Sequence, residues 1–364
     1  MSPNPHPELV SEGYGPSRRP RWVELATSAD HKEIGQILVC GALGFLFIAL
    51  VELVLMRIQL LVPENTFLSP VAFNRMLSLY GATAIFFFAL PLVLGLFYYV
   101  APLQIGARGT ALPRLGQIGV ALWVAGATIL YAGFLFTPSE AGVNPLAPLS
   151  ELAFLSNNGV DAWAASTGLA ILGFVFLAID LLTTLRAMRA PGMAWRRVPL
   201  FAWAATVSSW LMLAIGPVLL AALTMLMIDR NYDGIFFADG SGGAPLLWQH
   251  LSWIFYTGAY MLILIFAFGA IAEIVATFSR KPLFNQPVTM ASLAAIAVLG
   301  TLAWMQNMLT APIGVGWMYF AMLMSLALIV PLGLVIFNLI ATLVGGTMRM
   351  RAPVLFAIGA ISSI

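Results

Sequence analysis

The 364-residue sequence has little charge and few of the side chains that bind metals: 9% of its residues are charged, and it contains three histidines and one cysteine. A soluble domain has about a quarter of its residues charged, so this composition excludes an ordinary soluble fold. A lone cysteine, Cys40, excludes an internal disulfide framework, and we expect it to be a small apolar residue of the core. The net charge of +2 indicates no particular partner, and we expect no nucleic acid among the partners.

Apolar residues dominate instead and make up 61% of the chain. They form eight runs of about the 20 residues that a helix needs to cross a bilayer. A ninth run begins near Pro353. The sequence therefore predicts an all-α, polytopic transmembrane helix bundle embedded in a lipid bilayer. The eight runs cover residues 35–56, 72–100, 116–137, 163–185, 200–228, 248–278, 288–310 and 317–344.

The ends of the chain and its basic residues predict the domain organisation. Residues 1–28 are polar and rich in proline, without the apolar region of a signal peptide. We predict an N-terminal arm at 1–28 and a membrane domain at 29–364, whose ninth span we expect to be cut short at Ile364. With a cytoplasmic N-terminus, 14 of the 17 lysines and arginines lie on the cytoplasmic side, and the remaining three are Arg57, Arg75 and Arg230. We expect an integral protein of a bacterial inner membrane.

Several motifs are distributed along these runs. The longest is the apolar stretch Gln249–Ile274, which contains a cluster of polar residues, and the shorter ones are ADHKEIG at 29–35, MRIQL at 56–60, APLQIGAR at 101–108 and MRAPGM at 188–193. Together they resemble subunit I of the heme–copper oxidases, the family of cytochrome c oxidase, over residues 25–364. The resemblance implies the fold of that subunit, heme and copper cofactors, and other subunits of a respiratory membrane complex as partners.

The same resemblance implies which positions hold the chemistry of the family, and this chain has other residues there. The position of a low-spin heme ligand is Tyr80, and the positions of the three copper ligands are Thr257, Gln306 and Asn307. Arg57 matches an arginine beside a heme substituent, although an interfacial arginine explains it without heme. Ala259 is at the position of the family's proton-carrying glutamate, and Met261 is at that of its cross-linked tyrosine. The positions of its proton channels are Tyr98, Gly109, Gly116 and Val335.

These replacements are poor ligands for the family's cofactors. Carboxamides bind a copper ion weakly compared with imidazole, and tyrosine ligates ferric heme only as a phenolate, so we expect Tyr80 to pack or to hydrogen-bond. The histidines, His6, His31 and His250, align outside every metal position. Two further heme ligands of the family align beyond Ile364. We therefore expect no heme, no copper and no catalytic residue in this chain.

Two acids inside the predicted spans, Glu52 and Asp180, need separate explanations. An acid within the bilayer requires a partner or a neutral state, and it often marks a functional site. For Asp180 we expect exposure at the interface or pairing with Arg186, in preference to a role as a proton relay. Arg57 lies too close to the membrane surface to be assumed as the partner of Glu52.

Three functions are compatible with the sequence. Loss of the ligands with retention of the framework favours a pseudoenzyme, a structural or assembly subunit of a respiratory complex. The alternative is a functional terminal oxidase subunit, an oxidoreductase that uses heme and copper to oxidise cytochrome c, reduce oxygen and pump protons. Its ligands would come from beyond Ile364 or from another chain. The third is a carrier or proton pathway through Glu52 and Asp180, but no inverted repeat or pair of broken helices supports it.

Overall fold

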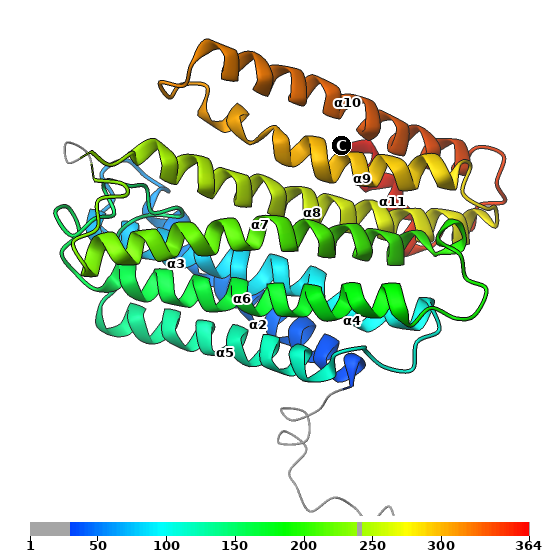
Figure 1. Cartoon of the computed structure of the whole chain (residues 1–364), viewed down its shortest axis with the longest axis horizontal. Coiled ribbons are helices and arrows are strands. Elements are labelled where there is room, and N and C mark those ends of the chain that lie inside the picture. The colour runs from blue at the N-terminus through cyan, green and yellow to red at the C-terminus, as the bar shows by residue number, and fades with distance from the viewer. Residues whose placement is uncertain (1–29, 239–241, 364) are drawn as a thin grey trace, which may run out of the picture.

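A computed structural model describes residues 30–238 and 242–363, and the regular secondary structure of these two ranges is helical. Eight of its helical segments are long and apolar enough to cross a membrane. Figure 1 shows the long helices side by side with roughly parallel axes. The predicted all-α transmembrane bundle is therefore confirmed, and the protein is an integral membrane protein. Every predicted apolar run lies within one of the eight segments or overlaps most of it.

The spans follow one another through connections of different lengths, and the one between α5 and α6 covers residues 137–158. The second span is a continuous rod in which a π-helical segment, η1, joins two α-helices. The seventh span continues past its α-helix into a 3₁₀ turn, η3. The helices are α2 (His31–Gln59), α3 (Pro70–Ala82), η1 (Thr83–Ala89), α4 (Leu90–Gln104), α5 (Pro113–Phe136), α6 (Gly159–Ala187), η2 (Trp195–Arg197), α7 (Leu200–Asn231), α8 (Pro245–Ser279), α9 (Gln286–Leu302), η3 (Trp304–Met308), α10 (Val315–Leu343) and α11 (Ala352–Ser363).

Neighbours in the sequence are mostly neighbours in space. Helix α5 packs on α6, α6 on α7, α7 on α8, and α9 on α10, while α2 packs against α4. In Figure 1, α5 and α10 lie at opposite edges of the bundle, with α6, α7 and α8 between them. This order agrees with the general rule that elements consecutive in the sequence are usually adjacent in space. The main core fills the space between these helices.

Small residues allow the closest helix contact, between α5 and α6. A Cβ atom added to Gly173 would lie 2.5 Å from the Gly119 carbonyl oxygen, and one added to Gly119 would lie 2.8 Å from the Gly173 carbonyl oxygen. The two backbones therefore touch at these glycines. Because lipid tails are as apolar as leucine, close packing of this kind is a main source of helix association in membranes.

The first helix begins with a capped end, and its cysteine lies outside the core. The Asp30 side chain caps α2 and accepts a hydrogen bond from the backbone amide of Lys32 at 2.9 Å. Cys40 is exposed, on a helix that packs through Leu38 and Ala42, both fully buried. The prediction that Cys40 lies in the core was wrong. Outward-facing residues of a membrane helix are also apolar, so hydrophobicity alone does not locate its buried face.

Candidate functional site

The three positions that the family resemblance assigns to copper ligands meet at one cavity. Thr257 on α8 and Gln306 and Asn307 on η3 line a space of about 500 Å³. Two further replaced positions, Ala259 and Met261, line the same space from α8. The chain therefore brings together residues about 50 positions apart in the sequence, because α8 and η3 pack against each other.

Each of these three residues has a polar atom that forms a hydrogen bond. The Asn307 carboxamide nitrogen donates to the Thr257 hydroxyl at 3.1 Å and to the Trp304 carbonyl at 3.2 Å. The Gln306 carboxamide oxygen accepts from the Ser325 hydroxyl of α10 at 2.8 Å. These bonds join α8, η3 and α10 across the cavity wall. Hydrogen-bonded side chains therefore occupy the positions at which the family resemblance implies copper ligands.

The donor set does not fit a copper ion. A hydroxyl and two carboxamides carry no charge and bind a borderline metal much less well than imidazole does, and the Asn307 nitrogen is a hydrogen donor with no free lone pair. Within residues 30–238 and 242–363, no group of three or more His, Cys, Asp and Glu side chains is placed to hold a metal ion. We therefore derive no redox step through copper at this cavity.

Two residues that the sequence did not identify also line the cavity. The Tyr256 hydroxyl and the Asn144 carboxamide oxygen are buried, and neither has a hydrogen-bond partner among the described residues. Buried polar atoms usually bond to protein or to water, so the cavity offers polar contacts to a small molecule. No motif indicated Asn144, which lies in the connection between α5 and α6 and reaches the cavity only in the folded chain.

His250 lies outside the lining of this cavity. Its Nδ1 atom accepts a hydrogen bond from the Trp304 indole nitrogen at 3.2 Å. The bond ties the beginning of α8 to η3, next to the wall formed by Asn307 and Thr257. His250 therefore acts in the structure as a positioning contact between two elements.

Two of the positions assigned to proton channels, Tyr98 and Gly116, lie beside Asp180. The Tyr98 hydroxyl donates to the Asp180 carboxylate at 2.7 Å, and the backbone amide of Leu112 donates to its other oxygen at 2.7 Å. Asp180 is fully buried, and a Cβ on Gly116 would lie 3.3 Å from its carboxylate. The expected exposure of Asp180 and its expected pairing with Arg186 were both wrong. Its partners come from α4 and from the beginning of α5.

Glu52 lies in a different part of the bundle. It is 4% exposed, and its side chain lies near Thr83 of η1 and Tyr131 of α5. Those two hydroxyls bond to each other at 2.8 Å, and neither oxygen of Glu52 has a hydrogen-bond partner among the described residues. Glu52 and Asp180 share no partner, so the structure does not join the two acids in one network.

The remaining predicted positions lie apart from the cavity lining. Tyr80 is half-buried and lies one turn before η1, a π-helical segment of a kind that is frequent at functional sites. Arg57 is exposed in the last turn of α2, as an interfacial arginine would be. Val335 is fully buried in α10, and Gly109 has open space around its Cα.

The eight-span helical bundle and the convergence of the aligned positions on one cavity define the class of this protein. It is a polytopic membrane protein built like subunit I of an oxidase. Residues 33–364 match the family model described as "Cytochrome C and Quinol oxidase polypeptide I". The chain belongs to that family. This membership confirms the resemblance that the motifs indicated.

Individual relatives agree with this membership. The chain is 35% identical to cytochrome c oxidase subunit 1 of Bacillus sp. (strain PS3), with 93% of this chain and 55% of the relative covered. It is 33% identical to cytochrome c oxidase subunit 1 of Cereibacter sphaeroides, with 97% and 68% covered, and 35% identical to cytochrome bo(3) ubiquinol oxidase subunit 1 of Buchnera aphidicola, with 93% and 52% covered. The chain spans about half the length of several of these curated relatives.

Proposed function

We propose that this chain is a non-catalytic structural or assembly component of a respiratory membrane complex. One observation carries the proposal: the three copper-ligand positions still converge on one cavity, but hydroxyl and carboxamide groups hold it together. The family architecture is retained while its metal-binding chemistry is replaced. The basic residues further support a cytoplasmic N-terminus in a bacterial inner membrane, with other subunits of the complex as partners.

The replaced proton-channel positions support the same proposal. Proton transfer requires a chain of waters or polar side chains, whereas Tyr98 fills the space beside Asp180 and both Asp180 oxygens accept hydrogen bonds. A carboxylate held by a tyrosine and a backbone amide stabilises the contact between α4, α5 and α6. In this proposal Asp180 is a structural residue, and proton pumping by this chain is not expected.

The second candidate function is that of a working terminal oxidase subunit. The names of its relatives favour it, as does a cavity at the copper positions that offers unpartnered polar atoms. It requires heme and copper ligands that residues 30–238 and 242–363 do not supply. A proton pathway through Glu52 and Asp180 has less support, because the two acids belong to separate networks.

The first test is a reduced-minus-oxidised optical spectrum of the protein, purified with its native partners, with iron and copper quantified on the same sample. We expect no heme band and no stoichiometric metal assigned to this chain. Heme bands that persist when this chain is isolated would overturn the proposal and favour the oxidase.

A second test restores the ligands. The triple variant Thr257→His, Gln306→His and Asn307→His places three imidazoles around the cavity, and we expect it to bind about one copper ion per chain because imidazole is a strong ligand for copper. The natural chain should bind none, and His250→Ala should leave the metal content unchanged. Copper bound by the natural chain at this cavity would contradict the proposal.

A further inference from the structure

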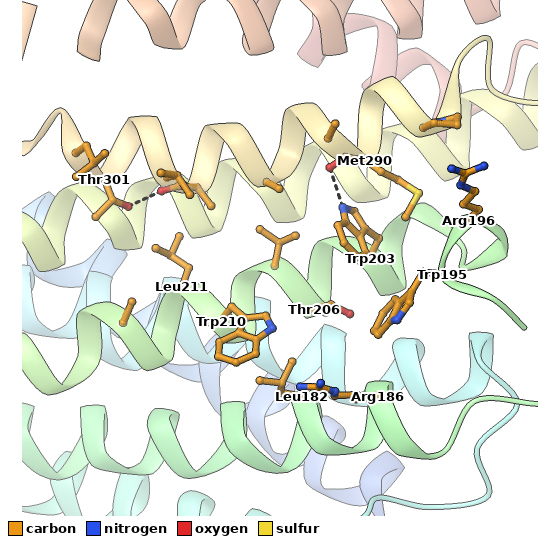
Figure 2. Close-up of a pocket in the computed structure, with 18 residues that line it drawn as sticks. Leu182, Arg186, Trp195, Arg196, Trp203, Thr206, Trp210, Leu211, Met290 and Thr301 are labelled. Atoms are coloured by element: carbon orange, nitrogen blue, oxygen red, sulfur yellow. Dashed lines mark hydrogen bonds between the residues drawn. The ribbon is translucent and has the colours of Figure 1, made fainter. Parts of the chain in front are cut away.

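An apolar groove with arginines in its lining lies apart from the cavity at the copper positions. It has a volume of about 860 Å³ and lies between α6, α7 and α9. Figure 2 shows Arg186 and Arg196 on either side of Trp195, with Trp203 and Met290 nearby. None of the functions discussed above uses this groove, and none of its lining residues belongs to the cavity at the copper positions.

Three polar groups of the groove walls form hydrogen bonds within the protein. The Trp203 indole nitrogen donates to the Met290 carbonyl at 2.9 Å and so joins α7 to α9. The hydroxyls of Thr206 and Thr301 donate within their own helices at 2.9 and 2.7 Å. Along most of its length the groove therefore offers mainly apolar contacts. It is open to the surroundings of the bundle, since its lining residues Trp210 and Val298 are 54% and 58% exposed.

The basic end has charges without counterions. Arg186 and Arg196 are exposed, and neither makes an ion pair or a hydrogen bond with any residue in 30–238 or 242–363. A third guanidinium, that of Arg189, stacks on the Trp195 ring at 3.8 Å. Two of the Arg189 nitrogens are buried without a hydrogen-bond partner among the described residues. Several positive groups therefore meet at the point where the apolar groove ends.

We propose that this groove binds an anionic phospholipid from the bilayer. The phosphate lies beside Trp195, within reach of the long, exposed side chains of Arg186 and Arg196, and the acyl chains extend along α7 and α9 toward Thr301. A basic pocket between membrane helices is a general recognition site for acidic lipid headgroups. Charge complementarity at one end and apolar walls elsewhere match the two parts of such a lipid.

The length of the groove agrees with this occupant. Its lining extends along α9 from Pro287 to Leu302, which is about 22 Å at 1.5 Å per residue. One leaflet contributes about 15 Å, half of the hydrocarbon thickness of a bilayer. The groove therefore accommodates an acyl chain together with the glycerol region below the headgroup. The proposal does not depend on whether the chain is catalytic.

The test uses the protein, with any subunits that copurify, in nanodiscs containing equal amounts of phosphatidylglycerol and phosphatidylcholine. Native mass spectrometry after release measures the retained lipid, and a phosphatidylglycerol with a photoactivatable acyl chain locates it by peptide mapping. We expect selective retention of phosphatidylglycerol and crosslinks to α7 and α9. Each basic residue near the headgroup strengthens the attraction about fivefold, so Arg186→Gln with Arg196→Gln should weaken retention about 30-fold.

Two further variants separate the headgroup site from a folding defect. Arg197→Gln removes a charge from the same turn but outside the groove lining, and it should retain the lipid as the natural chain does. Ala294→Trp fills the groove while keeping both arginines, and it should abolish the crosslinks. Circular dichroism and size-exclusion chromatography confirm folding of each variant. The proposal would be overturned if phosphatidylcholine were retained equally, or if the double variant retained phosphatidylglycerol as the natural chain does. It would also be overturned if a polypeptide or an uncharged isoprenoid were crosslinked in place of the phospholipid.

Discussion

The strongest prediction concerns a buried ion pair at the end of α7. The Arg230 side chain is fully buried, and its Nε and Nη2 atoms donate to the Asp161 carboxylate at 2.8 and 3.1 Å. It also donates to the backbone carbonyls of Leu155 at 3.2 Å, of Asn157 at 2.8 Å, and of Ser150. One guanidinium thus holds the connection between α5 and α6 against the ends of two membrane helices.

Replacing Asp161 by Ala leaves this guanidinium buried without its counterion. Breaking a buried pair by removing one partner costs about 3–5 kcal/mol, whereas an exposed pair contributes at most about 1 kcal/mol. We expect the higher range, because the Arg230 side chain is fully buried while that of Asp161 is only 15% exposed. In an Arg230→Met background the same substitution should cost about 2–3 kcal/mol less, the coupling expected for two residues in contact.

The measurement is reversible unfolding in mixed detergent micelles, followed by circular dichroism. The matched control is Glu140→Ala, which breaks the more exposed pair between Arg75 and Glu140, with side chains 40% and 22% exposed. It should cost about 1 kcal/mol or less. If Asp161→Ala costs no more than Glu140→Ala, then burial does not make this pair important, and the reasoning is refuted.

Two other predictions use the same unfolding assay. Asp180→Ala should lower the free energy of unfolding by about 3 kcal/mol, because the Leu112 amide and the Tyr98 hydroxyl both lose their acceptor. Asp180→Asn keeps one acceptor and should lower it by about 1 kcal/mol. Equal losses for the two variants would argue against this structural role. Gly173→Ala should cost about 1–3 kcal/mol through overpacking against the α5 backbone, while Gly44→Ala, which faces open space, should stabilise by about 0.5–1 kcal/mol. A neutral Gly173→Ala would show that α5 and α6 separate easily.

Part of the candidate site could be predicted from the sequence. The motifs identified Thr257, Gln306 and Asn307 as one set, and the structure places them around one cavity. Their hydrogen bonds to each other and to α10 could not be predicted, since these depend on how η3 turns against α8. Asn144 and Tyr256 also escaped prediction, because no local pattern indicates which residues a distant cavity will contact.

The sequence by itself determined the class of fold. Lipid satisfies no backbone hydrogen bonds, so an apolar run of about 20 residues has to form a helix within the bilayer, and the eight spans follow from run lengths alone. Tertiary structure decided which side of each helix is buried. Lipid-facing and core-facing residues are equally apolar, so Cys40 lies on the outside against expectation. Packing also determines that Tyr98 and Leu112, and not Arg186, are the partners of Asp180. A buried side chain can accept hydrogen bonds only from the donors that the folded chain places beside it.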